Sequence, residues 1–192
     1  MALNYSFLKR PILLALFCCM MNLVIAQTPE IKKIRSTGKH NSASLGFNIP
    51  VGNFSLTHFG GIALEYSRSN QHFGKWQSVL AKKLGLVVNG GVAYYSGKKE
   101  LVSGYRYHYP GYSFLHVYPG LLYHLNPKST MSLSAGPAIR LYNGTVQFCM
   151  GANLMGSYYL NKVLAITPGL ICIKESGADP LMSLSLKASL AF

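Results

Sequence analysis

The sequence has little charge, and very little of that charge is negative. Its 192 residues include 18 Lys and Arg but only five Asp and Glu, and charged residues make up 12% of the chain. A domain with a water-facing surface usually has about a quarter of its residues charged. The shortage argues against an ordinary water-facing coat. The formal net charge of +13 favours a phosphate-rich partner.

A long apolar run is also missing. The longest, from about Pro11 to Ala26, is near 16 residues, whereas a membrane-spanning helix needs about 20. Lys9 and Arg10 precede this run, and Ala26 ends it as a small residue suited to a cleavage site. We interpret residues 1–26 as a cleaved secretory signal peptide, with an uncleaved anchor helix as the alternative.

The segment that follows, residues 27–40, is polar and basic and has no apolar periodicity, so we expect a flexible periplasmic lead-in. Without the signal peptide the chain has 16 basic and five acidic side chains, a formal net charge of +11. Nucleic acid is a poor partner for an exported protein without a basic helix face. Phosphorylated lipid headgroups are the polyanion that we expect instead.

Cysteine is scarce, with four in the chain, and Cys18 and Cys19 fall in the signal peptide. Cys149 and Cys172 could pair only if their strands were neighbours in a suitable register, and a count of two does not imply a disulfide. We expect free thiols.

Helical periodicity is missing beyond the signal peptide, and alternation of apolar and polar residues takes its place. The apolar faces are long, whereas the polar faces consist mainly of Ser, Gly, Asn, Ala and Gln. Segments of about ten residues match the length of a tilted strand that crosses a bilayer. Eight segments show or allow this pattern, with the fourth less regular than the others and the seventh apolar on both faces: 41–52, 61–67, 83–95, 113–124, 130–142, 145–159, 163–174 and 181–192.

Two kinds of barrel would alternate in this way. A soluble secreted ligand-binding barrel turns its apolar face inward, and a membrane barrel turns it toward lipid. The small uncharged polar faces suit a narrow lumen, and a closed barrel leaves no backbone group unpaired in lipid. We therefore predict an all-β fold over residues 41–192, an eight-stranded antiparallel up-and-down transmembrane β-barrel in an outer membrane. Tyrosines near strand ends predict its aromatic girdles: Tyr66, Tyr94, Tyr123, Tyr142 and Tyr158.

The connections alternate in length. Those around Pro127 and Asn161 are short, as turns on the inner side are, whereas residues 96–112 form a long outer loop. The connection 68–83 fits poorly because it is long where a short turn is expected. An extra strand or a short helix there is one explanation, and an unusual turn is the other.

Four stretches carry a family resemblance: "GIALEY", "LSAGPAIRLY", "LNKVLAITPGL" and the terminal "SLKASLAF". With the signal peptide, they resemble the small outer-membrane β-barrel proteins of Gram-negative bacteria, the OmpX/OmpA-like group. The resemblance identifies an architecture and no specific activity. It implies that a terminal aromatic after alternating apolar residues is recognised by the barrel-insertion machinery, and Phe192, Leu190 and Leu186 match that signal.

The alternation of the predicted strands places a set of polar and charged side chains inside the barrel, which we expect to form a network. An eight-stranded barrel has room only for side chains, and a buried charge must be paired or wetted. We expect a structural lumen plug and no channel, rather than a proton relay or a gate. Its members are Glu65, Arg140, Lys187, Asn89, Gln147 and Asn153.

The outer loop is the most distinctive exposed stretch. Tyrosine and arginine dominate binding hot spots, so the loop is a candidate for contact with lipopolysaccharide phosphates, a glycan or another partner. An aromatic girdle extended upward as a rigid strand is the alternative. The candidate residues are Tyr105, Arg106, Tyr107, His108, Tyr109 and Tyr112.

Catalysis receives weak support. The histidines have no spacing that suits a metal ion, and we expect no cofactor. Some eight-stranded barrels are lipid A-modifying hydrolases with a Ser/His site at the rim. Ser113 with His116, or Ser55 with His58, could supply such a pair, but no third orienting group is evident. We expect a monomeric, non-enzymatic barrel with a structural or surface-interaction role.

Overall fold

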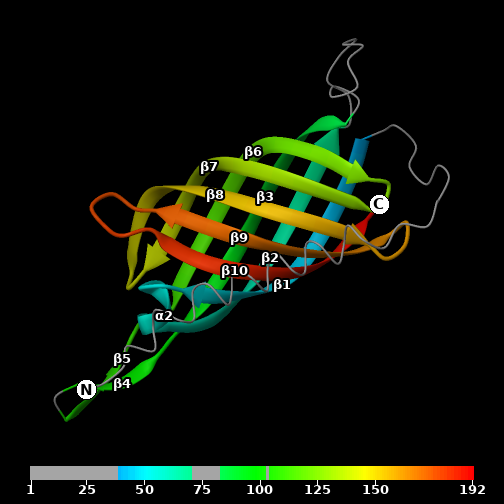
Figure 1. Ribbon diagram of the computed structural model, residues 1–192. Helices are drawn as coiled ribbons and strands as arrows, with labels where there is room; N and C mark the ends of the chain where they lie inside the picture. Colours follow the sequence, from blue (N-terminus) through cyan, green and yellow to red (C-terminus); the bar gives the residue numbers. More distant parts are fainter. Residues whose placement is uncertain (1–38, 71–82, 103) are drawn as a thin grey trace, which may run out of the picture. The chain divides into compact units, whose positions relative to one another are not determined.

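The computed structural model describes residues 39–102 except 71–82, and residues 104–192. The expected signal peptide, most of the lead-in and most of the 68–83 connection lie outside the described residues. Two short strands and one helical turn supplement a closed barrel (Figure 1): β4 (Lys99–Val102), β5 (Tyr105–His108) and α2 (Phe54–Thr57). The barrel strands are β1 (Lys39–Val51), β2 (His58–Asn70), β3 (Leu84–Gly97), β6 (Tyr112–Asn126), β7 (Ser129–Tyr142), β8 (Thr145–Tyr159), β9 (Leu164–Lys174) and β10 (Leu181–Ala191).

Each barrel strand pairs antiparallel with its neighbour in the chain, and β1 pairs with β10 to close the sheet. At this seam the Phe192 backbone N–H donates to the Asn41 carbonyl at 2.9 Å. All eight predicted segments are strands, so the predicted up-and-down fold is confirmed. Strand β1 begins at Lys39, two residues before the expected start of the barrel.

The apolar side chains point out of the barrel. Leu45, Leu133 and Leu186 are 64%, 59% and 58% exposed, whereas Ser134 and Ser185, next to two of them in the chain, are 1% and 4% exposed. An apolar exterior of this extent suits hydrocarbon tails, and the closed sheet satisfies the backbone groups there. The alternative of a soluble barrel with its apolar face inward is therefore wrong. No helix in the described ranges is long and apolar enough to cross a membrane.

Strand β9 carries apolar side chains on both faces, which is why its sequence did not show which face points inward. Ile171 and Ile173 point into the barrel with 8% and 3% exposure, while Ile166 points outward. Both faces therefore carry aliphatic side chains. Cys172 lies on the outward parity of β9 and Cys149 on the inward parity of β8, and both thiols are free, as expected.

The two ends of the barrel differ. At the end that we call the turn end, residues 127–128 and 160–163 make short connections, and β1 begins where β10 ends. At the opposite end, the loop end, lie α2, the β4–β5 hairpin and residues 175–180. The long outer loop thus contains a two-stranded hairpin, which extends beyond the barrel at the lower left of Figure 1.

A tight turn joins β7 to β8 at the loop end. Asn143 and Gly144 have φ values of +48° and +73°, the left-handed pair that a two-residue type I′ hairpin requires. Asn and Gly tolerate this conformation better than other residues, which explains the Asn-Gly pair at this position.

The lipid-facing exterior makes a depth-dependent prediction. Leu186 lies in the middle of β10, so Leu186→Arg should lower the free energy of unfolding by about 2–4 kcal/mol, because a cation is then placed in hydrocarbon. Leu141, next to the end of β7, is the matched control, and Leu141→Arg should cost no more than about 1 kcal/mol. Equilibrium denaturant unfolding in lipid vesicles measures both. Equal costs at the two positions would contradict the proposed membrane placement.

Candidate functional site: the lumen and the loop end

A charged cluster lies across the middle of the lumen. Lys187 Nζ is 2.7 Å from Glu65 Oε2, and His116 Nε2 lies 3.3 Å from the same oxygen. Lys187 on β10 is 2% exposed and Glu65 on β2 is 7% exposed. Because β1 separates β10 from β2 and β3 separates β2 from β6, these contacts are made between strands that are not neighbours. The buried carboxylate and ammonium are therefore paired, as burial requires.

Glycines on nearby strands make room for this cluster. Gly46 is the register partner of Lys187, and a Cβ on Gly46 would lie 2.4 Å from Lys187 Cγ. Tyr118 stacks on His116 with ring centroids 4.5 Å apart. A Cβ on Gly151 would lie 1.9 Å from the Tyr118 hydroxyl oxygen. Larger side chains at these two positions are incompatible with the observed packing.

Toward the loop end, aromatic rings fill the lumen. We call this group the aromatic plug. Phe54, from α2, is 3% exposed and packs against Tyr95 at 4.9 Å and Tyr112 at 5.6 Å between ring centroids. The Tyr95 hydroxyl also contacts Ser183 Oγ at 2.8 Å. The complete plug comprises Phe54, His58, Tyr95, Tyr112, Phe114 and Tyr142.

Two tyrosines of the plug were expected elsewhere. Tyr142 was predicted in an outward girdle and Tyr112 on the outer-loop surface, but their rings face each other at 5.3 Å and Tyr112 is 4% exposed. Both predictions are wrong for the same reason. Each residue falls on the inward parity of its strand, Tyr142 with Arg140 and Tyr112 with Phe114.

Arg140 belongs to a second ion pair. Its guanidinium contacts Glu175, which follows β9 and is buried. It also lies over the rings of Tyr112 and Tyr142, 5.7 and 5.8 Å from their centroids. Burial raises the pKa of the Glu175 carboxyl from its ordinary value because it disfavours the charged form. The adjacent guanidinium acts in the opposite direction and favours the charged carboxylate. Arg140 therefore lies beside the plug and not in the Glu65 cluster.

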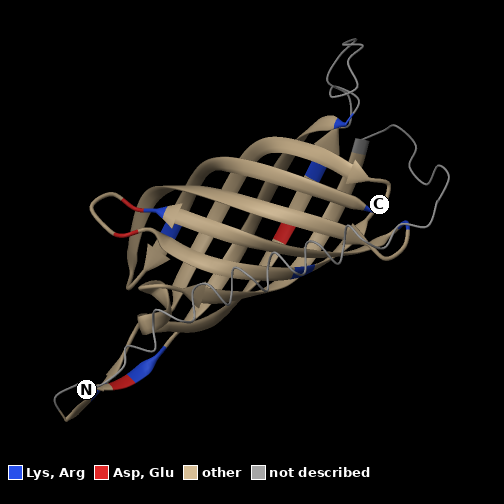
Figure 2. Ribbon diagram, in the orientation of Figure 1, with Lys and Arg blue, Asp and Glu red and all other residues tan. Residues whose placement is uncertain are grey.

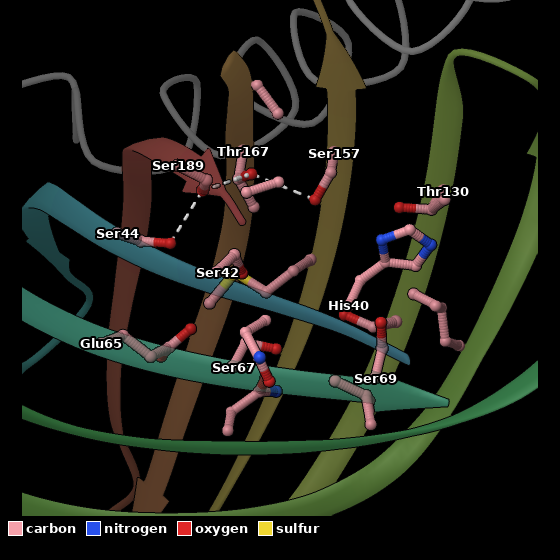
Figure 3. A pocket seen from close by; sticks show the side chains of 18 of the residues that line it. His40, Ser42, Ser44, Glu65, Ser67, Ser69, Thr130, Ser157, Thr167 and Ser189 are labelled. Atoms are coloured by element: carbon pink, nitrogen blue, oxygen red, sulfur yellow. Dashed lines mark hydrogen bonds between the residues drawn. The ribbon is translucent and has the colours of Figure 1, made fainter. Parts of the chain in front are cut away.

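At the turn end the lumen contains a cavity of about 60 Å³ with hydroxyl groups in its wall (Figure 3). Ser44 donates to Ser189 at 2.8 Å, and Thr167 lies 3.1 Å from Ser189 and 3.0 Å from Ser157. This volume suits a few water molecules. Glu65 lies in its wall, and it also lines a second, smaller cavity of about 10 Å³ together with His116 and Lys187.

The remaining residues of the predicted network have separate surroundings. Asn89 donates to Ser134 Oγ at 3.0 Å, and Asn153 is 3% exposed inside the barrel. Gln147 is half-buried toward the loop end and pairs in register with Arg140. The predicted network lacks Glu175, and it lacks His116, which the sequence suggested only as a partner of Ser113. The alternation in β6 could have located His116, because its neighbours Leu115 and Val117 point outward and His116 must therefore point inward.

The candidate hydrolase pairs do not form. Ser113 is the register partner of the outward Tyr94, whereas His116 points inward, so the two lie on opposite faces of the sheet. Ser55 donates its hydroxyl to the Gly52 carbonyl at 2.7 Å. The nitrogens of His58 contact Thr57 Oγ1 at 2.8 Å and the Pro110 carbonyl at 3.2 Å.

The β4–β5 hairpin carries the rest of the predicted outer-loop surface. Tyr105 is 81% exposed, and the other three β5 residues, Arg106, Tyr107 and His108, are also exposed. Tyr109 packs edge-on against Tyr107, with ring centroids 4.8 Å apart. Leu101 on β4 is 71% exposed. The hairpin thus presents aromatic, aliphatic and basic groups together.

Together, the closed antiparallel sheet and the apolar exterior define the class of protein: its fold is that of an integral outer-membrane β-barrel of eight strands. No family model and no curated protein matches the sequence. The likeness is to solved structures, and at the identities found it concerns the fold.

The chain is similar to the Yersinia pestis attachment invasion locus protein Ail. In a phospholipid bilayer nanodisc, Ail matches with a TM-score of 0.53 and 10% identity, over 80% of this chain and 99% of that one. The Ail crystal structure matches with a TM-score of 0.51 and 9% identity, over 82% and 100%. The outer membrane enzyme PagL matches with a TM-score of 0.47 and 17% identity, over 78% and 97%, a likeness too loose to bear on chemistry.

The charged cluster makes a prediction about coupling. Lys187→Met alone leaves a buried carboxylate with only His116 beside it, and Glu65→Gln alone leaves a buried ammonium. Each should lower the free energy of unfolding by about 3–5 kcal/mol. The double variant removes both charges and should be more stable than either single one. A double-mutant cycle from denaturant unfolding in vesicles measures this coupling, and additive losses would contradict the paired geometry.

Proposed function

We propose that this protein is a non-enzymatic outer-membrane barrel that acts through its loop-end surface, with its lumen serving as a structural plug. The observation that carries the proposal is a contrast between interior and surface. The lumen is interrupted by the Glu65 cluster and again by the aromatic plug, whereas the β4–β5 hairpin is exposed. A lumen so filled offers no path for solutes, which leaves the surface as the place of function.

The orientation follows from the two ends. Outer-membrane barrels have short periplasmic turns and longer extracellular loops. The turn end is thus periplasmic, and the hairpin faces the outside.

The chemistry of the hairpin suggests its partner. Arg106 offers a cation, and Tyr105 and Tyr107 offer rings with hydroxyl groups. Such residues bind phosphates and sugar faces and are enriched in hot spots. We propose lipopolysaccharide, through its phosphates or its glycan, as the surface that the hairpin contacts, with the barrel acting as a monomer.

Biogenesis has its own determinant. Leu186 and Leu190 on β10 and Phe192, which directly follows this strand, point outward and are 58%, 53% and 72% exposed. We include in the proposal that the barrel-insertion machinery recognises this apolar row.

Binding by the hairpin is tested with the triple variant Tyr105→Ala, Arg106→Ala, Tyr107→Ala. We expect at least tenfold weaker binding of purified lipopolysaccharide by the protein in detergent, measured by surface plasmon resonance. The matched control is Leu56→Ala with Phe59→Ala, which removes exposed apolar side chains from the same end (63% and 70% exposed) outside the hairpin. Dephosphorylated lipopolysaccharide separates phosphate from sugar recognition. Unchanged binding by the triple variant would refute this role.

Closure of the lumen is tested in planar bilayers. The protein should give no ion-conducting steps, because side chains block the lumen at two levels. Heat-modifiable migration on a gel provides the control that inserted protein is folded. Stable unitary conductance from folded protein would show that the barrel is a channel.

A further inference from the structure

A ring of basic side chains surrounds the turn end of the barrel and has no part in the loop-end role. Arg68 lies near the end of β2, and Lys83 directly precedes β3. Lys128 lies in the β6–β7 turn and Lys162 in the β8–β9 turn. Every connection at this end thus contributes at least one cation. We call these four residues the basic belt.

The belt is available for binding. Arg68, Lys83 and Lys162 are exposed, and Lys128 is half-buried. In the part of the chain that the structure describes, none of the four forms an ion pair. Exposed cations that lack acidic neighbours are free to attract an external anion.

The register places the belt beside outward-facing tyrosines. Arg68 follows Tyr66 on the same face of β2. Lys83 precedes Leu84, the register partner of Tyr123, and Lys128 precedes Ser129, the partner of Tyr158. Tyrosines at strand ends mark the boundary between hydrocarbon and headgroups. The cations one or two residues further along therefore lie at the depth of lipid headgroups.

Acidic residues are segregated from this end. In Figure 2 the red positions lie on the hairpin, in the β9–β10 loop and on one strand of the barrel wall. These are Glu100, Glu175, Asp179 and the lumenal Glu65, and the described turn end has none. The loop end has cations too, but Arg140 is paired with Glu175 and Lys174 donates to the Ala178 carbonyl. Only the turn end is uniformly basic among the described residues.

From this placement we propose that the basic belt binds the phosphates of anionic phospholipid headgroups in the leaflet that surrounds the turn end. A bilayer with anionic lipid attracts basic residues at its surface electrostatically. The belt and the tyrosines would together fix the depth of the barrel, with rings below the phosphates and cations at them. The inference rests on the proposed function in one respect, the placement of the barrel in a membrane. The proposed orientation decides only which leaflet the belt contacts.

The test measures lipid preference directly. The protein is reconstituted in phosphatidylcholine vesicles that contain spin-labelled phosphatidylglycerol or spin-labelled phosphatidylcholine. Electron paramagnetic resonance then gives the fraction of each lipid immobilised at the barrel. We expect phosphatidylglycerol to associate at least threefold more strongly at low salt, and expect this preference to fall at 0.5 M NaCl because salt screens surface charges.

Two matched variants locate the preference. In the turn-end variant R68Q/K83Q/K128Q/K162Q, the ratio of phosphatidylglycerol association to phosphatidylcholine association should fall close to one. The loop-end variant K98Q/K99Q/R106Q/K174Q removes the same charge and should keep most of the preference. Equal losses in both variants, or no preference in the wild-type protein, would overturn the inference.

Heat-modifiable migration identifies variants that fail to fold. For these, single glutamine substitutions in the belt are measured instead, and each should lower the ratio in part. A protein that does not insert into vesicles at all would refute the proposed function too. A protein that inserts and binds lipopolysaccharide without a phosphatidylglycerol preference would refute only the belt.

Discussion

The pairing of backbone N–H and C=O groups around a closed ring of strands is the constraint on which the rest of this structure depends. Hydrocarbon offers those groups no partner, so a sheet in lipid can have no free edge. Here the edges meet where β1 pairs with β10, and Asn41 bonds to Phe192 at the end of that seam. Once the ring is closed, the period-2 alternation of every strand divides the side chains into a lipid-facing set and an enclosed set.

Enclosure then dictates the chemistry of the lumen. Eight strands surround a space that side chains nearly fill, so small hydroxyl residues fit where the lumen is narrow. The charged side chains that do enter come with partners, Lys187 with Glu65 and Arg140 with Glu175. Each pair spans one intervening strand, β1 between Lys187 and Glu65 and β8 between Arg140 and Glu175. They therefore add contacts across the lumen that the backbone ladder alone does not provide.

The strand pattern was predictable because lipid imposes one rule on all eight strands. Alternation located every strand to within a few residues and gave the inward direction of Glu65 and Lys187. It did not show that His116, rather than Arg140, completes the Glu65 cluster, because contacts across a lumen depend on the stagger of strands that are distant in sequence. Tyr112 and Tyr142 were placed wrongly because Tyr112 was assigned to the outer loop and Tyr142 to a girdle at a strand end, whereas the parity of their strands directs both inward. In β9, Ile171 and Ile173 pack inward against other apolar groups, so no polar face was present to reveal the direction.

The central claim, that the aliphatic face meets lipid and the hydroxyl face is enclosed, can be tested residue by residue. Nitroxide labels at Leu133 and at its neighbour Ser134, introduced as single cysteines in a Cys149→Ser, Cys172→Ala background, report collisions with oxygen and with a water-soluble nickel complex in reconstituted vesicles. The account predicts high oxygen and low nickel accessibility at position 133, and low accessibility to both reagents at position 134. High nickel accessibility at 134 together with low oxygen accessibility at 133 would contradict it.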